Sequence, residues 1–171
     1  MALQGKFVIN DADFSPLMFY GVGTFMAFSG AGPYRNHGAC AMIPKKGPVP
    51  DGKYWIVARP AGGPRSKAIT WVKDAFNSLY SDNTVSHSEW FALYRDDSII
   101  DDYTWIESVR RGAFRLHPGT LSEGCITLAH VTDFMAIRNA LLRTHTVPVR
   151  NTGLQAFGII DVIHSGAKDC L

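Results

Sequence analysis

A histidine and a cysteine close together in the sequence are the residues best suited to do chemistry. His117 ends an apolar run, a Pro-Gly turn follows, and Cys125 comes directly after Gly124 at the start of a second apolar run. A cysteine is a nucleophile only as its thiolate, so a catalytic cysteine needs a nearby imidazole or another source of positive charge. We therefore expect Cys125 to be the nucleophile and His117 to take its proton, with the imidazole oriented by a backbone carbonyl near Pro118 or Ser122.

The residues before and after the turn predict how these two side chains meet. Residues 113–117 alternate like a strand, which places Arg115 and His117 on one face. The turn then returns the chain, and we expect Cys125 to come within hydrogen-bonding distance of the imidazole. Gly124 has no side chain where a substrate carbonyl must approach. We expect the N–H groups of Gly124 and Cys125 to receive the developing oxyanion.

The segment from His117 to Ile126, His-Pro-Gly-x-x-Ser-x-Gly-Cys-Ile, resembles the active-site signature of the YkuD-type L,D-transpeptidases. Residues 111–118 and 122–128 are more narrowly similar to the type VI secretion L,D-transpeptidase effector family. Shorter matches at residues 28–30, 47–54 and 90–94 extend this resemblance through most of the chain. One departure is clear. Ordinary YkuD enzymes have a histidine before the Gly-Cys pair and an arginine two residues after the cysteine, where this chain has Glu123 and Thr127.

The resemblance implies an antibacterial effector that modifies peptidoglycan through a cysteine thioester. Cleavage of the terminal D-Ala from a tetrapeptide stem would be L,D-carboxypeptidase activity, and its exchange for another D-amino acid, or a 3-3 cross-link, would be L,D-transpeptidase activity. The effector resemblance favours trimming and exchange. It also implies peptidoglycan stem peptides, a cognate immunity protein and type VI secretion components as partners, and action in the periplasm of a target bacterium.

Four further residues are candidates for binding substrate or supporting the site. Arg115 is suited to hold a substrate carboxylate, the alternative being an ordinary salt bridge on the strand. Ser122 either bonds within the turn or touches substrate, and Ser29 either lines the substrate cleft or bonds its own backbone. Trp90 begins an alternating stretch over residues 89–95, of which one face is expected to border the site.

Composition limits the other classes of function. A chain of 171 residues suits a single domain over residues 1–171, and a net charge of +2 with scattered lysines and arginines argues against a nucleic-acid surface. The first residues lack the apolar segment of a secretion signal, so we expect a protein made in the cytoplasm without a signal peptide and with no membrane insertion. Cys40 and Cys170 can pair in an oxidising compartment, leaving Cys125 free.

The predicted elements give a mainly antiparallel β domain with two helices. The resemblance implies the YkuD type of β-sandwich or open barrel, with the cysteine in a cleft. The apolar patterns predict strands at residues 6–10, 53–59, 89–95, 113–117 and 155–163, two short strands or one bulged strand within 17–28, and helices beginning at Ser66 and at Thr132 or Asp133.

Three other interpretations remain. A metal site built from His117, Cys125, His130 and His145 matches no zinc spacing, and we expect neither a metal nor a cofactor. An NlpC-type peptidase would place its cysteine well before its histidine, the reverse of the order here. A non-catalytic cell-wall-binding or secretion-adaptor module is the third alternative, and the intact His117, Cys125 and Arg115 argue against it.

Overall fold

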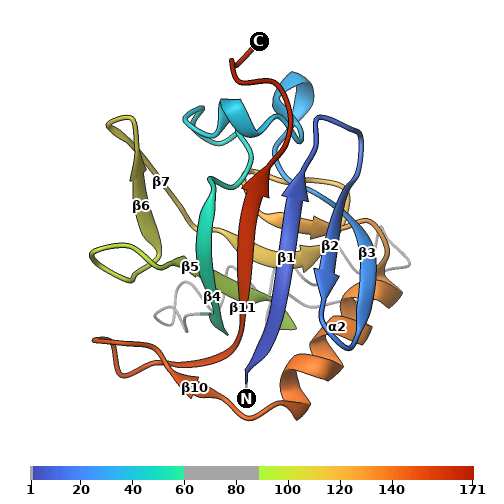
Figure 1. The fold of residues 1–171 in the computed structure, drawn as a ribbon, viewed down its shortest axis with the longest axis vertical. Coiled ribbons are helices and arrows are strands. Elements are labelled where there is room, and N and C mark those ends of the chain that lie inside the picture. Colours follow the sequence, from blue (N-terminus) through green and yellow to red (C-terminus); the bar gives the residue numbers. More distant parts are fainter. Residues whose placement is uncertain (1, 60–88) are drawn as a thin grey trace, which may run out of the picture.

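The chain folds around a barrel of β-strands in the computed structural model, which describes residues 2–59 and 89–171 (Figure 1). Around the barrel the strands follow the order β1-β2-β3-β9-β8-β5-β4-β11, and β11 pairs again with β1. The barrel strands are β1 (Leu3–Ile9), β2 (Ser15–Phe19), β3 (Gly23–Phe28), β4 (Gly52–Ala58), β5 (Phe91–Arg95), β8 (Arg115–Pro118), β9 (Ile126–Leu128) and β11 (Gln155–His164).

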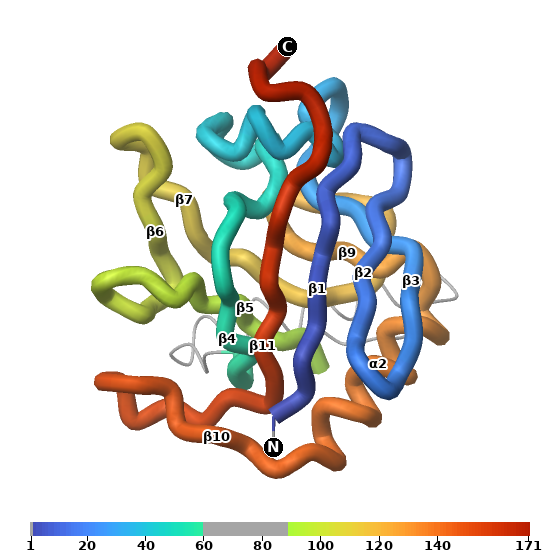
Figure 2. Tube along the Cα trace, viewed as in Figure 1, coloured from blue at the N-terminus to red at the C-terminus, as the bar shows by residue number. Residues whose placement is uncertain are grey.

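The two ends of the chain close the barrel. β1 and β11 run parallel and in register from the pair Leu3–Gly158 to the pair Ile9–His164, and Figure 2 shows them side by side. A β-sandwich or an open barrel was expected from the sequence, whereas this pairing makes the barrel closed. No local pattern predicts it, because a parallel pairing between distant segments depends on everything that lies between them.

The core fills the barrel and continues beneath the helix α2 (Val131–Arg143). Alternation along each strand sends every second side chain inwards, as the fully buried Phe7 and Ile9 of β1 show. On α2 the apolar residues Phe134 and Ile137 are fully buried in the same cluster, because a spacing of three or four residues makes one face of a helix.

Most of the predicted elements are confirmed. The mainly β class holds, two strands occupy residues 17–28, and α2 begins beside the predicted Thr132. The helix predicted from Ser66 lies outside the described residues. The strand predicted from residue 113 begins instead at Arg115, because Ala113 has a left-handed φ of 56° that breaks the extended chain.

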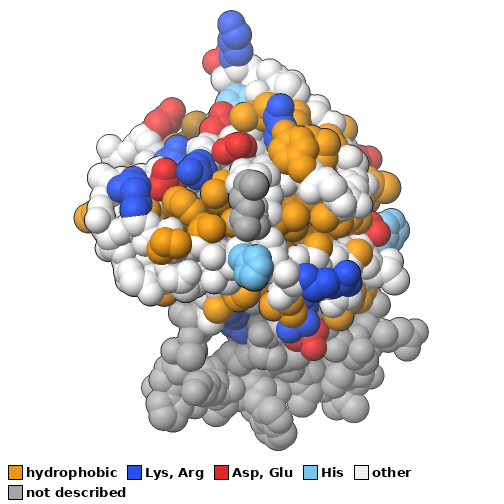
Figure 3. Space-filling model, turned by 60° about the horizontal axis from the view of Figure 1, so that its bottom comes forward, with side chains coloured by type: hydrophobic (Ala, Val, Ile, Leu, Met, Phe, Trp, Pro, Cys, Tyr) orange, Lys and Arg blue, Asp and Glu red, His pale blue; other side chains and the backbone are white. Residues whose placement is uncertain are grey.

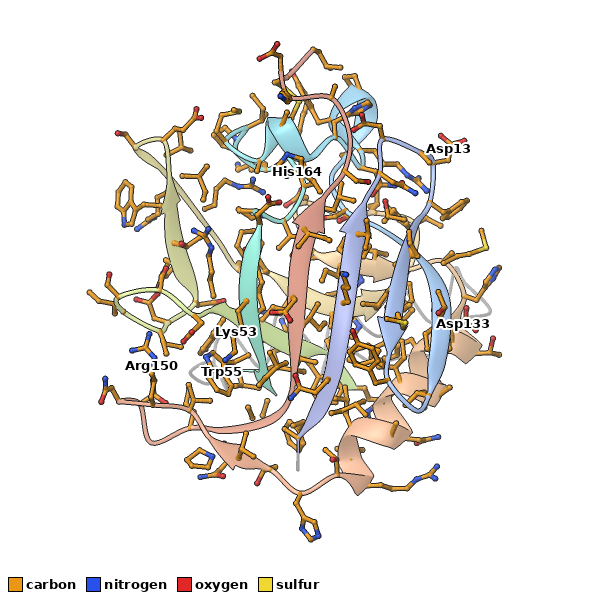
Figure 4. The ribbon with its side chains drawn as sticks, viewed as in Figure 1. Asp13, Lys53, Trp55, Asp133, Arg150 and His164 are labelled. Carbon is orange, nitrogen blue, oxygen red and sulfur yellow. A yellow bond between two sulfur atoms is a disulfide. The ribbon has the colours of Figure 1, made fainter. Side chains whose placement is uncertain are left out.

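Smaller elements surround the barrel. A two-stranded ribbon of β6 (Tyr103–Ile106) and β7 (Val109–Gly112) stands beside it, and the short β10 (Val147–Pro148) pairs with β11. Figure 4 shows Lys53 and Trp55 beside β4, on the side towards Arg150. There the indole N–H of Trp55 donates to Asp96, which also accepts from Arg150.

The segment between β3 and β4 carries two single-turn helices, η1 (Gly32–Tyr34) and η2 (Gly38–Cys40). Cys40 of η2 forms a disulfide with Cys170, and Cys125 is a free cysteine. The pairing that the sequence left open is therefore formed, and it ties the C-terminal tail to this segment.

The face shown in Figure 3 carries hydrophobic side chains across its middle, with lysine and arginine side chains among them. Among the described residues, no helix has the length and apolar character that crossing a membrane requires.

Candidate active site

Of the two residues singled out from the sequence, His117 lies on β8 and Cys125 directly precedes the neighbouring β9. β8 and β9 run parallel, with Leu116 paired to Ile126 and His117 paired to Thr127. The same register places Cys125, which precedes β9, opposite the start of β8. Because side chains alternate along a strand, Cys125 belongs to the same face as Thr127 and His117. The fold thus brings the histidine and the cysteine to one face of one strand pair.

Three contacts from the described residues hold the His117 imidazole. Its Nδ1 atom lies 2.8 Å from the carbonyl oxygen of Pro118, so in the neutral ring the proton belongs on Nδ1 and the carbonyl accepts it. Nε2 is then the basic nitrogen, and the Thr127 hydroxyl lies 3.3 Å from it. The ring also stacks on the Trp90 indole, with centroids 4.1 Å apart and planes inclined by 19°. The imidazole is therefore set in one orientation and one tautomer.

Cys125 is a partly exposed residue, and its sulfur lies 4.0 Å from the carbonyl oxygen of Ala113. Desolvation raises the pKa of this thiol, while hydrogen bonds from the main chain at Arg115 and Glu123 and the charge of Arg115 oppose the rise. The thiol is therefore neutral at neutral pH in the free protein. The expected hydrogen bond between sulfur and imidazole is not among those of the described residues, since the sulfur is directed towards Ala113.

Gly124 is required by the neighbouring side chains. Its φ is 94°, in the left-handed region that favours glycine. A Cβ at this position would collide with Nη2 of Arg111 and would lie 3.1 Å from the Phe114 ring. Close approach of an arginine therefore explains why this residue is a glycine.

Ser122 fastens the Gly-Cys turn to the segment between β3 and β4, and Ser29 ties together two parts of that segment. The Ser122 hydroxyl accepts a hydrogen bond from the N–H of Gly30, at 3.1 Å, and donates one to the carbonyl of Cys125, at 2.9 Å. The Ser29 hydroxyl accepts a hydrogen bond from the N–H of Val49 at 2.7 Å and is fully buried. Both serines bond main chain, and the buried Ser29 does not lie on a substrate-lining surface.

The guanidinium of Arg115 is occupied by a carboxylate of the protein. It forms two hydrogen bonds with Asp102, at 2.7 and 2.9 Å, in the forked geometry typical of arginine and carboxylate. The salt bridge, which the sequence left open beside the substrate-binding role, is the arrangement that the structure shows.

Three residues of the site received no role from the sequence. Thr127 faces Nε2, Asp102 holds Arg115, and Arg111 lies buried beside Gly124 with only 4% of its surface exposed. A signal for Arg111 exists in the alternation of the ribbon, which turns Arg110 outwards and Arg111 inwards. The contacts of Asp102 and Thr127 depend on pairing between distant segments, so no local sequence pattern predicts them.

The metal alternative gains no support from the geometry. Within residues 2–59 and 89–171, no group of three or more histidine, cysteine, aspartate or glutamate side chains is arranged to hold a metal ion. His130 instead precedes the first turn of α2 as its N-cap residue.

The fold and the site define a mainly β domain with an oriented imidazole on one strand and a partly exposed cysteine directly before the parallel strand beside it. The family model described as the Tlde1 domain matches residues 23–152, and the chain belongs to this family. The family is one of type VI secretion effectors with L,D-transpeptidase-type activity, which makes the chain a member of a peptidoglycan-acting class of enzymes. Comparison with curated proteins and with solved structures gives no match.

Proposed function

We propose that this protein is a cysteine-dependent enzyme that removes the terminal D-Ala from peptidoglycan tetrapeptide stems and exchanges it for other D-amino acids. The observation that carries the proposal is the placement of Cys125 and the basic Nε2 of His117 on one face of β8 and β9. The Pro118 carbonyl has the part that an orienting carboxylate has in other nucleophile–histidine pairs, since it holds the proton on Nδ1.

The mechanism follows from the neutral thiol. Rotation about the Cα–Cβ bond of Cys125 turns the sulfur from Ala113 towards Nε2, and the proton passes to the imidazole as the sulfur attacks. The attacked carbonyl is that of the L-centre of the diamino acid in the stem. The N–H groups of Gly124 and Cys125 receive the oxyanion, a type of contact whose loss costs about 3 kcal/mol in barrier height.

Collapse of this intermediate releases D-Ala, which takes its proton from His117, and leaves a thioester on Cys125. Water then gives L,D-carboxypeptidase activity, and a free D-amino acid gives exchange. The amine of a neighbouring stem would give a 3-3 cross-link. Trimming and exchange both remove the tetrapeptide donors that wall synthesis requires, which suits a toxin.

The same proposal includes the setting of the reaction. A type VI effector acts after delivery, so the substrate is met in the periplasm of the target bacterium, and a cognate immunity protein protects the producing cell. Residues 1–171 form the catalytic domain. The disulfide between Cys40 and Cys170 suits an oxidising compartment of this kind.

The experiment is digestion of purified sacculi, with the stem peptides identified by mass spectrometry. Wild-type protein should convert tetrapeptide stems to tripeptides and, with an added D-amino acid, to exchanged tetrapeptides. Cys125→Ala and His117→Ala should do neither, while His145→Ala, at an exposed histidine beyond α2, should match wild type. If Cys125→Ala leaves the muropeptides and the growth inhibition of target cells unchanged, the non-catalytic module becomes the better interpretation.

A further inference from the structure

Arg111 is a buried cation whose hydrogen bonds to the described part of the chain all go to main-chain carbonyls. Nη1 donates to the carbonyls of Ala41 and Pro48, and Nη2 donates to that of Gly47 at 2.9 Å. No carboxylate among the described residues forms a salt bridge with it. A buried charge without an opposite charge is costly, and burial accordingly lowers the pKa of Arg111.

The guanidinium lies directly against the turn that carries the nucleophile. Its Nη2 atom occupies the space where a side chain on Gly124 would stand, and its Cζ atom lies 5.5 Å from the centre of the Phe114 ring. Gly124 is covalently joined to Cys125, and electrostatic interaction with Cys125 raises the pKa of Arg111 against the effect of burial. The positive charge and the sulfur therefore belong to one small region.

None of the other charged or titratable groups described around the sulfur provides a buried positive charge without a carboxylate partner. Arg115 on β8 also lowers the pKa of the Cys125 thiol by its charge, but this charge is paired with that of Asp102, whereas the charge of the exposed Glu123 in the turn raises the same pKa. Tyr54 on β4 is buried, and desolvation raises its pKa, so it stays a neutral phenol. In the proposed reaction His117 takes the proton of the nucleophile, so its positive charge arises in that step.

We propose that Arg111 is a positioning residue for Cys125, which packs the Gly124 turn into place and supplies the buried positive charge that favours the thiolate. The role of Arg111 in catalysis rests on the proposed function. The effect of Arg111 on the pKa of the Cys125 thiol does not. This positioning role also explains why the residues around Gly47 turn three carbonyls towards one side chain. They fix a cation beside the position where negative charge develops.

Cys125 is the only cysteine outside the disulfide, so its alkylation by iodoacetamide reports the thiolate fraction directly. The pH dependence of this reaction is to be measured for wild type, Arg111→Gln and Arg111→Lys. Arg110→Gln is the matched control, because the adjacent Arg110 is on the outward face of the same strand and stacks on Tyr103.

Arg111→Gln should raise the thiol pKa by about one unit, which slows alkylation at neutral pH about tenfold. Arg111→Lys keeps the positive charge but loses the planar guanidinium that donates to several carbonyls at once. It should therefore lower kcat about tenfold or more, with KM within about twofold of wild type. Arg110→Gln should match wild type in both measurements.

A folded Arg111→Gln variant with the wild-type alkylation profile would overturn the inference, and so would Arg111→Lys with wild-type kcat. If Arg111→Gln fails to fold, the kinetics of Arg111→Lys decide the matter. Should wild type leave sacculi unchanged, the proposed function fails, while the alkylation profile still tests the action of Arg111 on the thiol.

Discussion

The indole of Trp90 and the imidazole of His117 are stacked, with their centroids 4.1 Å apart. Trp90 directly precedes β5, and His117 lies on the neighbouring β8. The pairing of these two strands therefore decides the plane of the ring whose Nε2 is the proposed base. The contact suggests that Trp90 acts on the reaction through the orientation of His117.

Trp90→Ala should lower kcat by about 10- to 100-fold, because small errors in the placement of a catalytic group cost this much. Trp90→Phe keeps a flat ring under the imidazole and should retain most of the activity. The measurement is steady-state release of D-Ala from a tetrapeptide. Trp105→Ala is the control, since Trp105 is 65% exposed on the ribbon. Equal losses in Trp90→Ala and Trp105→Ala would contradict a specific action on His117.

Ser122→Ala should destabilise the protein and reduce its activity together. The substitution leaves the N–H of Gly30 and the carbonyl of Cys125 without their shared partner in a buried place, at a cost of about 1–3 kcal/mol. Urea denaturation measures the free energy of unfolding. Ser98→Ala, at an exposed serine, should change it by less than about 0.5 kcal/mol. A Ser122→Ala protein as stable as wild type would show that the hydroxyl does not fasten the turn.

Arg115 and Asp102 should be energetically coupled. Their forked contact is mostly shielded from water, with side-chain exposures of 15% and 21%. A double-mutant cycle with Arg115→Gln and Asp102→Asn should give a coupling of about 1.5–3 kcal/mol in the free energy of unfolding. A coupling near zero would return Arg115 to the role of a free substrate ligand. In that case Arg115→Gln would raise KM with little change in stability.

The disulfide should matter for stability beyond its own neighbourhood. Cys40 and Cys170 are 130 residues apart in sequence, so cross-linking them restricts the unfolded chain strongly. Replacing both with serine should reduce the free energy of unfolding by about 2–4 kcal/mol. Dithiothreitol should have the same effect on wild type and none on the double variant. A wild-type protein insensitive to reduction would contradict the prediction.

Much of the local structure could be predicted from the sequence. The alternation before His117, the turn after it and the spacing of Phe134 and Ile137 depend only on near neighbours in the chain. Each of these patterns corresponds to an observed element, although Ala113 delays the start of β8. The choice of His117 and Cys125 as the reactive pair also came from the sequence and stays a prediction until the variants are tested.

Other features were decided only in the tertiary structure. The parallel pairing of β1 with β11 closes the barrel. The guanidinium of Arg115 is paired with the carboxylate of Asp102, and Arg111 is buried against Gly124. Each of these joins segments that are separated in the chain, and their register is set by how all the strands pack at once. The sequence by itself determined which residues have reactive chemistry and how each short segment alternates. The closed barrel determined which of them meet, because distant pairing depends on the packing of the whole sheet and not on any one segment.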